Sequence, residues 1–574
     1  MKRIQRQLAF LLVLIMAFAL AGCGGSGDNS PNVPDSPASP APSSPNGSTS
    51  PSPAPSSSGG SSTPAPGNTN EPSSSAPPAP SEPKIVPLVR IAVADLATNV
   101  TPWMGTQTGR YLTLFSMYQP LVERSKETGE DILVLAKEIE DLDGFTKRVT
   151  IYDNIYDSAG NHFTASDAVF SINGAKEVGN ISGIRFIEDA EVVSDYVLDI
   201  TITVDNDYQF VASMAVLFMV TEAAFNASSD GMASAPVGTG PYRLEGWVSG
   251  SSLAMVKVDN YWGSYLADRN TNPGWYWHAQ NVERAEYTCI TEASQASIAL
   301  ENGTVDASWY MTQHEAERFM NSNDYNVWQQ TDTLTFNLYF NCGDQSPLSN
   351  KLLRQAICYA VDSQAVMDAN GGYGLLASTF GSRRFPEGLS QWDNEDYYGY
   401  DPEKAKQLLA DSGFDTRTPI RLMVANTTET RGTVAEVVQA YLFAIGIDVK
   451  IETYDGASFA ASRYDESVYD IKVDVQAFEG LPDIWNQFLS YRGQDSGKNY
   501  VYIHDEHLQS LMDAVASRGG MTPANLDAAH QYIKENAFIY SLYSQENFDV
   551  TNNLIAEVVR TTRYYALPGA CSYN

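Results

Sequence analysis

The sequence predicts an α/β protein that is divided into more than one lobe. The chain has 574 residues, which is too long for one hydrophobic core, so two or more lobes are expected. Alternating apolar runs typical of strands take turns with amphipathic runs of about a dozen residues that are typical of helices. Because strands that alternate with helices of this length usually pair in parallel, the pattern indicates an α/β layer structure.

The composition supports a large core and excludes some classes of partner. Hydrophobic residues make up 43% of the chain and aromatic residues 11%, which is ample for burial. The formal net charge of −33 offers nothing to offset the repulsion of phosphates. We therefore expect no nucleic-acid partner, and the charge predicts no basic patch for an anionic membrane surface.

The first residues read as an export signal. Three basic residues precede an apolar run from Leu8 to Ala21, which is shorter than the roughly 20 residues that a spanning helix needs. The run ends in Leu-Ala-Gly-Cys, which resembles the bacterial lipoprotein signal. That resemblance implies a signal peptide over residues 1–22 and a diacylglycerol on Cys23. The alternative is an ordinary signal peptide that contains a cysteine by chance.

A linker is predicted between this signal and the folded part. Residues 24–84 consist almost wholly of Gly, Ser, Pro, Asn, Thr and Ala, and such a segment cannot bury a core. We expect residues 23–84 to be a lipid-anchored, disordered tether whose prolines favour extended segments. Its long reach favours a Gram-positive-type envelope, with the protein on the extracytoplasmic face of the cell membrane.

Elements of the first half follow from periodicity and capping residues. The alternating run "LVRIAVADL" at 88–96 predicts a strand. In "FTASDAVFSINGAKE", Thr164 or Ser166 suits the N-cap of an amphipathic helix. The run "ASQASIALENGTVDAS" at 293–308 predicts a helix that stops at Asn302-Gly303 and is followed by a short strand.

The second half repeats the alternation. The run "NKLLRQAICYAVDSQAVMDA" at 350–369 predicts an amphipathic helix, and a second helix is opened by Asp401 and closed by Gly413. Three strands are expected between helices, in the runs "PIRLMVA", "IDVKIETY" and "YDIKVDVQAF".

One short stretch, "APVGTGPYRL" at 235–244, combines two prolines with two glycines before a strand. Gly238 and Gly240 permit a close approach of backbone, and Pro236 and Pro241 stiffen the chain. A surface turn is the simplest interpretation. A more specific one comes from the motifs that accompany it along the chain.

These motifs together resemble the solute-binding proteins of peptide/nickel-type (family 5) ABC transporters. The resemblance covers about residues 88–570 and follows the family order. It is carried by five runs: "NHFTASDAVFSI", "PVGTGPYRLEGWVSGSSLAMVKVDNYWG", "LENGTVDAS", "FNLYFNCGDQSPLSNKLLRQAICYAVD" and "YGYDPEKAKQLLADSGF".

This resemblance implies the fold of that family, which is a two-lobed periplasmic-binding-protein-like fold of the large class. It has an inserted subdomain and a hinge between the lobes. Lobe I is expected at 85–122, 225–333 and 541–574. An inserted subdomain is expected at 123–224, and lobe II at 334–540. Chain crossings near Thr333 and Ile539 would form the hinge.

The resemblance also implies a function. We expect an extracytoplasmic solute-binding lipoprotein of an ABC importer, which captures an oligopeptide or peptide-like solute between its lobes and delivers it to a membrane permease. The alternatives are a non-peptide solute such as an oligosaccharide, or a sensor or secreted enzyme on the same fold. The protein is expected to be a monomer without a cofactor.

The ligand site is expected after the strand "YDIKVDVQAF". In peptide-binding members an acidic side chain at this point meets the ligand's α-amino group, since a buried ammonium needs a charged partner. Counting from Tyr469 places Glu479 on that position, whereas counting back from Phe488 places Leu481 there. The ligand-binding residues predicted on the first count are Phe478, Glu479, Gly480 and Trp485.

No catalytic motif is found in the sequence. Neither a nucleophile elbow nor a phosphate-binding or HExxH pattern occurs, so we expect a binding protein and not an enzyme. His504 and His507 have a helical spacing that suits a metal, but the acids between them fit a helix start better. Among the cysteines, Cys342 and Cys571 are possible disulfide partners in an oxidising compartment, and Cys289 and Cys358 fit apolar packing.

Overall fold

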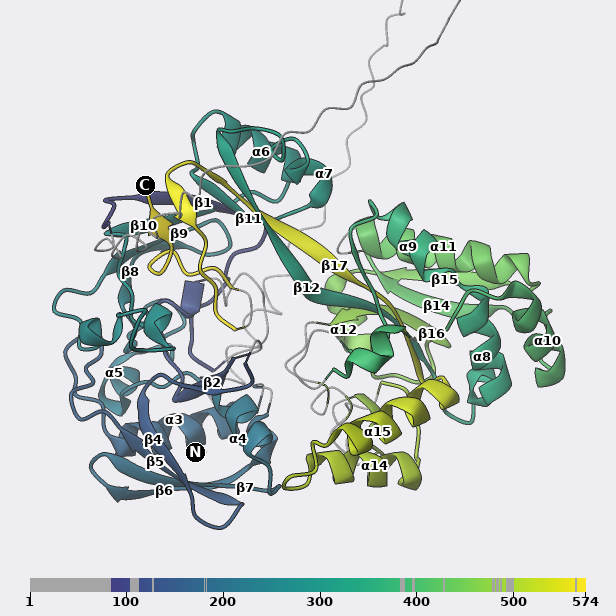
Figure 1. Cartoon of the computed structure of the whole chain (residues 1–574), viewed down its shortest axis with the longest axis horizontal. Coiled ribbons are helices and arrows are strands. Elements are labelled where there is room, and N and C mark those ends of the chain that lie inside the picture. Colours follow the sequence, from purple (N-terminus) through teal and green to yellow (C-terminus); the bar gives the residue numbers. More distant parts are fainter. Residues whose placement is uncertain are drawn as a thin grey trace, which may run out of the picture. The chain divides into compact units, whose positions relative to one another are not determined.

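A computed structural model divides the chain into two units, Met1–Ala79 and Pro80–Asn574, and the described residues belong to the folded unit Pro80–Asn574 (Figure 1). No helix among the described residues is long and apolar enough to cross a membrane. The residues that the structure describes are 84–103, 113–125, 128–179, 181, 183–381, 388–394, 398–426, 429–476, 481, 485, 488–491, 500–562 and 565–574.

The folded unit is organised around one large mixed sheet. Its strands follow the order β15-β14-β16-β12-β17-β11-β1-β10-β9-β8, and β13 pairs with β17 beside this path. Two long antiparallel strands in the middle, β12 (Tyr325–Phe340) and β17 (Ile539–Asn552), join the two halves of the sheet. We call this pair the crossover ribbon. The half of the sheet from β11 to β8 is here called lobe I, and the half from β16 to β15 is called lobe II.

Lobe I combines parallel and antiparallel strands. β1 pairs in parallel with β10 and β11, and β10 continues antiparallel into β9 and β8. Short helices α6 and α7 cover this half, and α5 precedes β8. The bounds are β1 (Val89–Val93), α5 (Glu222–Ala227), β8 (Tyr242–Val248), β9 (Ser252–Lys257), β10 (Arg284–Cys289), α6 (Ala293–Glu301), β11 (Ala307–Met311) and α7 (Gln313–Ala316).

A separate four-stranded antiparallel sheet, of order β4-β5-β7-β6, forms what we call the inserted subdomain. Helix α3 packs on it, and the small hairpin β2-β3 precedes it. Its elements all fall within the residues predicted for an insertion, 123–224, apart from the first residue of β2. They are β2 (Val122–Arg124), β3 (Asp131–Leu133), β4 (Ala136–Asp141), β5 (Thr146–Ile151), α3 (Ala165–Val178), β6 (Ile187–Ser194), β7 (Val197–Ile202) and α4 (Asp207–Met214).

Lobe II has parallel strands β14, β15 and β16 covered by helices on both faces (Figure 1). The bounds are α8 (Lys351–Ala360), α9 (Ser363–Ala369), β13 (Gly374–Leu376), α10 (Pro402–Ser412), β14 (Ile420–Ala425), α11 (Glu429–Ala444), β15 (Val449–Tyr454), α12 (Gly456–Ser462), β16 (Ile471–Gln476), α14 (Glu506–Ala516) and α15 (Pro523–Asn536). A two-stranded sheet, β18 (Ile555–Glu557) with β19 (Ser572–Tyr573), ends the chain.

The glycines of "APVGTGPYRL" permit a close backbone approach, as the sequence predicts. A Cβ on Gly238 would lie 2.2 Å from the carbonyl oxygen of Met117, and one on Gly240 would lie 2.7 Å from the same atom. The amide of Gly240 donates to that carbonyl at 2.9 Å. Since no side chain fits there, the two glycines seat the start of β8 against residues 116–117.

The crossover ribbon is irregular at its centre. Its pairing register shifts between Gln330 and Leu334 on β12, opposite residues 545–547 of β17, and shifts again between Phe336 and Asn337. Such bulges bend a strand and redirect its side chains. The predicted crossing point Thr333 falls within the first irregular stretch, and Ile539 is the first residue of β17.

Candidate ligand-binding site

Parallel strands from both lobes point their carboxyl ends toward the centre of the crossover ribbon. In lobe II the last residue of β16, Gln476, pairs with Thr335, which in turn pairs with Ser544. In lobe I the last residue of β11, Met311, pairs with Phe548. The two ends therefore meet the ribbon within a few residues of each other. Ligands of open α/β sheets bind outside the carboxyl ends of strands, which makes this the candidate site.

Buried polar side chains occupy the ribbon at this point. The hydroxyls of Thr335 and Ser544 lie 2.8 Å apart, and the Ser541 hydroxyl donates to Oδ1 of Asn337 at 2.5 Å. The Asn337 amide donates to the Thr335 carbonyl at 2.9 Å. Each of these four side chains is almost wholly buried. Because they bond to one another across the strands, their burial carries little penalty.

Asp474 on β16 stands next to this row, in register with Asn337. Its Oδ1 lies 3.3 Å from Nη1 of Arg431 and accepts the amide of Val475 at 2.9 Å. Its Oδ2 is buried and has no hydrogen-bond partner among the described residues. A buried carboxylate oxygen normally has a partner, so this atom is available to a donor that the described chain does not supply.

Lys472, two residues earlier on the same face of β16, is wholly buried. Its ammonium lies 3.5 Å from the centre of the Tyr500 ring, 4.9 Å from that of Tyr339 and 5.4 Å from that of Tyr469. Burial lowers the pKa of Lys472 to about 7, although the charge of Asp474 opposes the shift. Aromatic faces thus take the place of water around this cation.

On the lobe I side a buried carboxylate braces the ribbon. Asp549 of β17 accepts the amide of Tyr310 at 3.0 Å and two hydrogen bonds from Arg560, at 3.0 Å and 2.6 Å. Tyr310 has a φ of 60°, which is uncommon for a residue other than glycine, and it lies where the pairing of β11 shifts. Asp549 has its partners within the chain, so this group is structural.

Of the four sequence-predicted site residues, the structure describes one, Trp485. Phe478, Glu479 and Gly480 lie outside the described residues, two to four positions after Gln476. Trp485 is described and wholly buried, and its indole donates to the carbonyl of Phe380 at 3.1 Å. Among its cluster partners are Phe380, Phe488 and Leu489. Trp485 therefore packs in the lobe II core in this structure, and its role in a ligand wall stays a prediction.

Sequence reasoning missed Asp474, although a signal was present. In "IKVDVQ" two charged residues interrupt an apolar strand at positions i and i+2, so they share one face. A charged pair on one face of a buried strand is uncommon and indicates either an internal ion pair or a ligand contact. The structure brings Asp474 beside Arg431, which comes from α11.

The two histidines of the sequence-predicted pair each pack against a tyrosine ring. His504 stacks on Tyr491 with ring centres 4.1 Å apart, and His507 meets Tyr532 edge-on. Asp505 caps α14 by accepting the amide of Leu508 at 2.8 Å. Among the described residues no group of three or more His, Cys, Asp or Glu side chains is arranged to hold a metal ion.

The described cysteines Cys289, Cys342, Cys358 and Cys571 are all free thiols. A disulfide between Cys342 and Cys571, left open by the sequence, is therefore not formed in this structure. Burial raises the pKa of the Cys342 thiol to about 11. This environment suits small packed side chains and not reactive thiols.

A surface pocket of about 410 Å³ lies elsewhere on the ribbon. It is lined by Met320, residues 325–329 and Phe548. Phe548 belongs to the small core cluster under α6 and α7, whereas its neighbour Asp549 points to the opposite face. Among the residues that the structure describes, no charged side chain lines this pocket.

Comparison with known families gives one clear match. The family described as "Bacterial extracellular solute-binding proteins, family 5 Middle" matches residues 132–500, which is more than half of the chain. A dipeptide-binding protein of Escherichia coli is 25% identical over 421 residues, covering 67% of this chain and 75% of that protein. Heme-binding protein A of Haemophilus influenzae is 26% identical over 289 residues, covering 48% of this chain and only 49% of that protein.

Solved structures show the same fold. The oligopeptide-binding protein AppA of Bacillus subtilis, solved in complex with a nonapeptide, superposes with a TM-score of 0.69 at 18% identity. That comparison covers 86% of this chain and 100% of AppA. The substrate-binding protein CtaP of Listeria monocytogenes gives a TM-score of 0.71 at 19% identity, covering 85% of this chain and all of CtaP. The predicted two-lobed fold is therefore confirmed.

Proposed function

Because the chain belongs to family 5 of the bacterial extracellular solute-binding proteins, we propose that it captures an oligopeptide or peptide-like solute for an ABC importer. The solute lies where the carboxyl ends of β11 and β16 approach the crossover ribbon. The importer's permease receives it when the lobes open. The relatives that bind peptides support this class of ligand.

The observation that carries the proposal is a carboxylate oxygen of Asp474 that has no hydrogen-bond partner among the residues that the structure describes. It lies at the carboxyl end of a parallel strand, beside a row of buried polar groups on the ribbon. A peptide brings an ammonium and main-chain N–H groups, which are the donors that such an oxygen accepts. Glu479, which follows five residues later in the sequence and lies outside the described residues, stays the sequence-predicted partner of the peptide's ammonium. Main-chain hydrogen bonding in the manner of an added strand accounts for the rest of the binding.

Identification of a co-purified solute tests this function. We expect native mass spectrometry of the purified protein to show an adduct that is released on unfolding and has a peptide fragmentation pattern. Ligand-free protein should then rebind the released solute in a calorimetric titration. If the adduct is a sugar or another non-peptide solute and it rebinds to the ligand-free protein, that solute would replace the peptide in the proposal. Turnover of the solute during the titration would favour the enzyme alternative.

The N-terminal region anchors the protein to the membrane in this proposal. Support comes from the short apolar run that ends in Leu-Ala-Gly-Cys23. We expect Cys23→Ala to be released from the membrane fraction or to accumulate as an unprocessed precursor. Fractionation of cells that express either form, followed by immunoblotting, measures this. A processed Cys23→Ala protein that still partitions with membranes would contradict lipidation at Cys23.

A further inference from the structure

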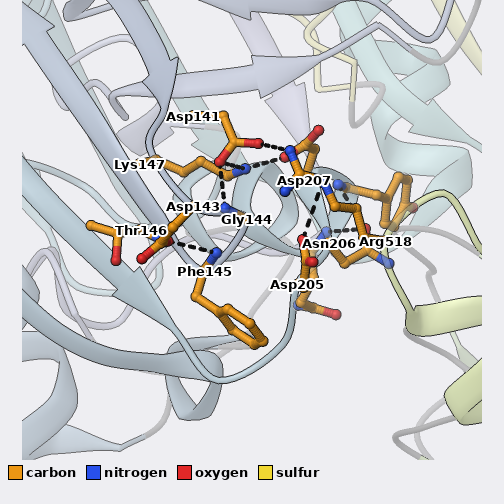
Figure 2. Close-up of polar contacts among 12 residues, drawn as sticks. Asp141, Asp143, Gly144, Phe145, Thr146, Lys147, Asp205, Asn206, Asp207 and Arg518 are labelled. Carbon is orange, nitrogen blue, oxygen red and sulfur yellow. Dashed lines mark hydrogen bonds and ion pairs between the residues drawn. The ribbon is translucent and has the colours of Figure 1, made fainter.

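The turn between α14 and α15 of lobe II contacts the inserted subdomain at a place that includes neither strand of the crossover ribbon (Figure 2). Arg518, in that turn, forms an ion pair with Asp141 at the end of β4. Its Nε also lies 3.7 Å from Oδ1 of Asp205, in the loop between β7 and α4. Arg518 and Asp141 are 377 positions apart in the chain. This is therefore a tertiary contact between the inserted subdomain and lobe II, and it lies apart from the crossover ribbon that joins the two lobes.

The subdomain side of the contact is organised by its own residues. Oδ1 of Asp141 accepts the amide of Gly144 at 2.7 Å and lies 3.1 Å from Nζ of Lys147. The hydrogen bond from the Gly144 amide is the main cause that lowers the pKa of Asp141, and the charges of Lys147 and Arg518 add to it. Asp141 therefore stays ionised at neutral pH and is held in place to receive a cation.

Gly144 makes room for the contact. Its φ is +91°, and a Cβ at this position would lie 2.4 Å from Oδ1 of Asp205 and 2.7 Å from Nη1 of Arg518. Any other residue here would be strained in its backbone and would also push the guanidinium away. The turn that follows β4 thus fits Arg518 closely.

A neutral bridge accompanies the ion pairs. Asn206 caps α4, since its Oδ1 accepts the amides of Tyr208 at 2.8 Å and Gln209 at 3.3 Å. Its Nδ2 donates at 2.8 Å to the carbonyl of Ala516, the last residue of α14. Terminal carbonyls of a helix lack partners within the helix, so one side chain satisfies helix ends in both units.

Carboxylates outnumber cations at this contact. Three carboxylates lie close together on the subdomain edge, those of Asp141, Asp205 and Asp207, and buried Lys147 pairs with Asp141 and Asp207. Arg518 supplies the second positive charge. Its side chain is 54% exposed, so water and salt screen the attraction and the contact is readily reversible.

We propose that Arg518 and Asn206 form a latch that holds the inserted subdomain against lobe II, and that breaking this latch is a step in opening the protein. The latch sets the balance between closed and open forms without solute, whereas the proposed function concerns the solute itself. The α14–α15 turn thereby controls that balance from a place outside the ligand site.

Small-angle X-ray scattering of the ligand-free protein at low and high salt tests the latch. At about 0.01 M salt charges interact over about 30 Å, and at about 1 M over about 3 Å. We expect the radius of gyration of the native protein to increase with salt as the latch is screened. Arg518→Gln should already be expanded at low salt and respond little to salt, with the closed-to-open ratio lowered about fivefold.

Two further variants sharpen the experiment. Asn206→Asp keeps the acceptor that caps α4 but removes the donor to Ala516, so we expect expansion without loss of folding. Arg417→Gln is the matched control, because Arg417 is 89% exposed and pairs with nearby Asp415. It should behave as the native protein does. Equal radii for native, Arg518→Gln and Asn206→Asp at both salt concentrations would overturn the latch. Since no solute is present, this outcome would leave the proposed function standing.

Discussion

At the scale of single residues, truncation of Trp485 distinguishes whether its side chain serves the core of lobe II or contacts the ligand. Its side chain is wholly buried among aromatic residues of lobe II. We expect Trp485→Ala to lower the free energy of unfolding of this lobe by about 3–5 kcal/mol, because truncation leaves a cavity. Urea unfolding followed by far-ultraviolet circular dichroism measures the loss. Tyr265→Ala, at a position that is 57% exposed, is the control and should change little.

The opposite result would assign Trp485 to the ligand site. If Trp485→Ala unfolds like the native protein but binds the solute more weakly, the indole serves the ligand and not the core. The sequence alone left both roles open, since an aromatic residue near the end of a strand fits either.

Lys472 predicts a dependence of stability on pH. Burial lowers its pKa to about 7 in the folded protein, from 10.5 in the unfolded chain. Below about pH 7 both states hold the proton, and the cost of the buried charge is constant. Between about pH 7 and pH 10 the unfolded state binds more protons, so the contribution of this group to stability rises with pH.

Comparison with Lys472→Met measures this contribution. We expect the variant to gain stability relative to the native protein at about pH 6, and the gain to shrink toward about pH 9. Lys450→Met, at a side chain that is 66% exposed, is the control and should show no such trend. Parallel stability curves for native protein and Lys472→Met would contradict a lowered pKa. Arg463 and Asp474 act on the same ammonium in opposite directions.

At the scale of elements, α10 shows how far local signals reach. Its predicted start at Asp401 and end at Gly413 are confirmed: Oδ1 of Asp401 accepts the amide of Lys404 at 2.9 Å, and Gly413 has a φ of 68°. We expect Asp401→Ala to lower the free energy of unfolding of lobe II by about 1 kcal/mol. Chemical denaturation measures it, with Asp401→Asn as a variant that keeps a capping oxygen. Equal losses in both variants would mean that capping is not the cause.

Whether the other elements could be predicted depends on whether their sequence signal lies within a few neighbouring residues. The strands β1, β14, β15 and β16 and the cap Thr164 of α3 were predictable, because alternation and capping lie within a few residues. The single helix predicted over 350–369 is wrong. It is two helices, because the chain leaves helical geometry at Val361 and Asp362 caps α9 through the amides of Gln364 and Ala365. Apolar periodicity continues across that break and hides it.

At the scale of the whole molecule, the fold was predictable only through the ordered motifs. Local patterns indicate an α/β class, but they do not show that two strands whose paired residues Thr335 and Ser544 are 209 positions apart cross between the lobes. The candidate site depends on the same long-range pairing, since β11 and β16 meet the ribbon from opposite sides. Asp474 and the contact of Arg518 with Asp141 likewise depend on residues that are distant in the chain.

The most direct measurement of the central claim is a calorimetric titration of ligand-free protein with a peptide and its N-acetylated form. In the proposed function a carboxylate after β16 anchors the ligand's ammonium, and Glu479 is the sequence-predicted group. We expect Glu479→Gln to weaken the free peptide by at least ~10-fold, since about 1.4 kcal/mol corresponds to one decade and a charge-assisted hydrogen bond contributes about 1.5–3 kcal/mol. The acetylated peptide should bind the native protein poorly and lose little more in the variant. Glu403→Gln, whose native side chain is 82% exposed, should bind as the native protein does. Equal affinity of native protein and Glu479→Gln for the free peptide, or undiminished binding of the acetylated form, would contradict the account.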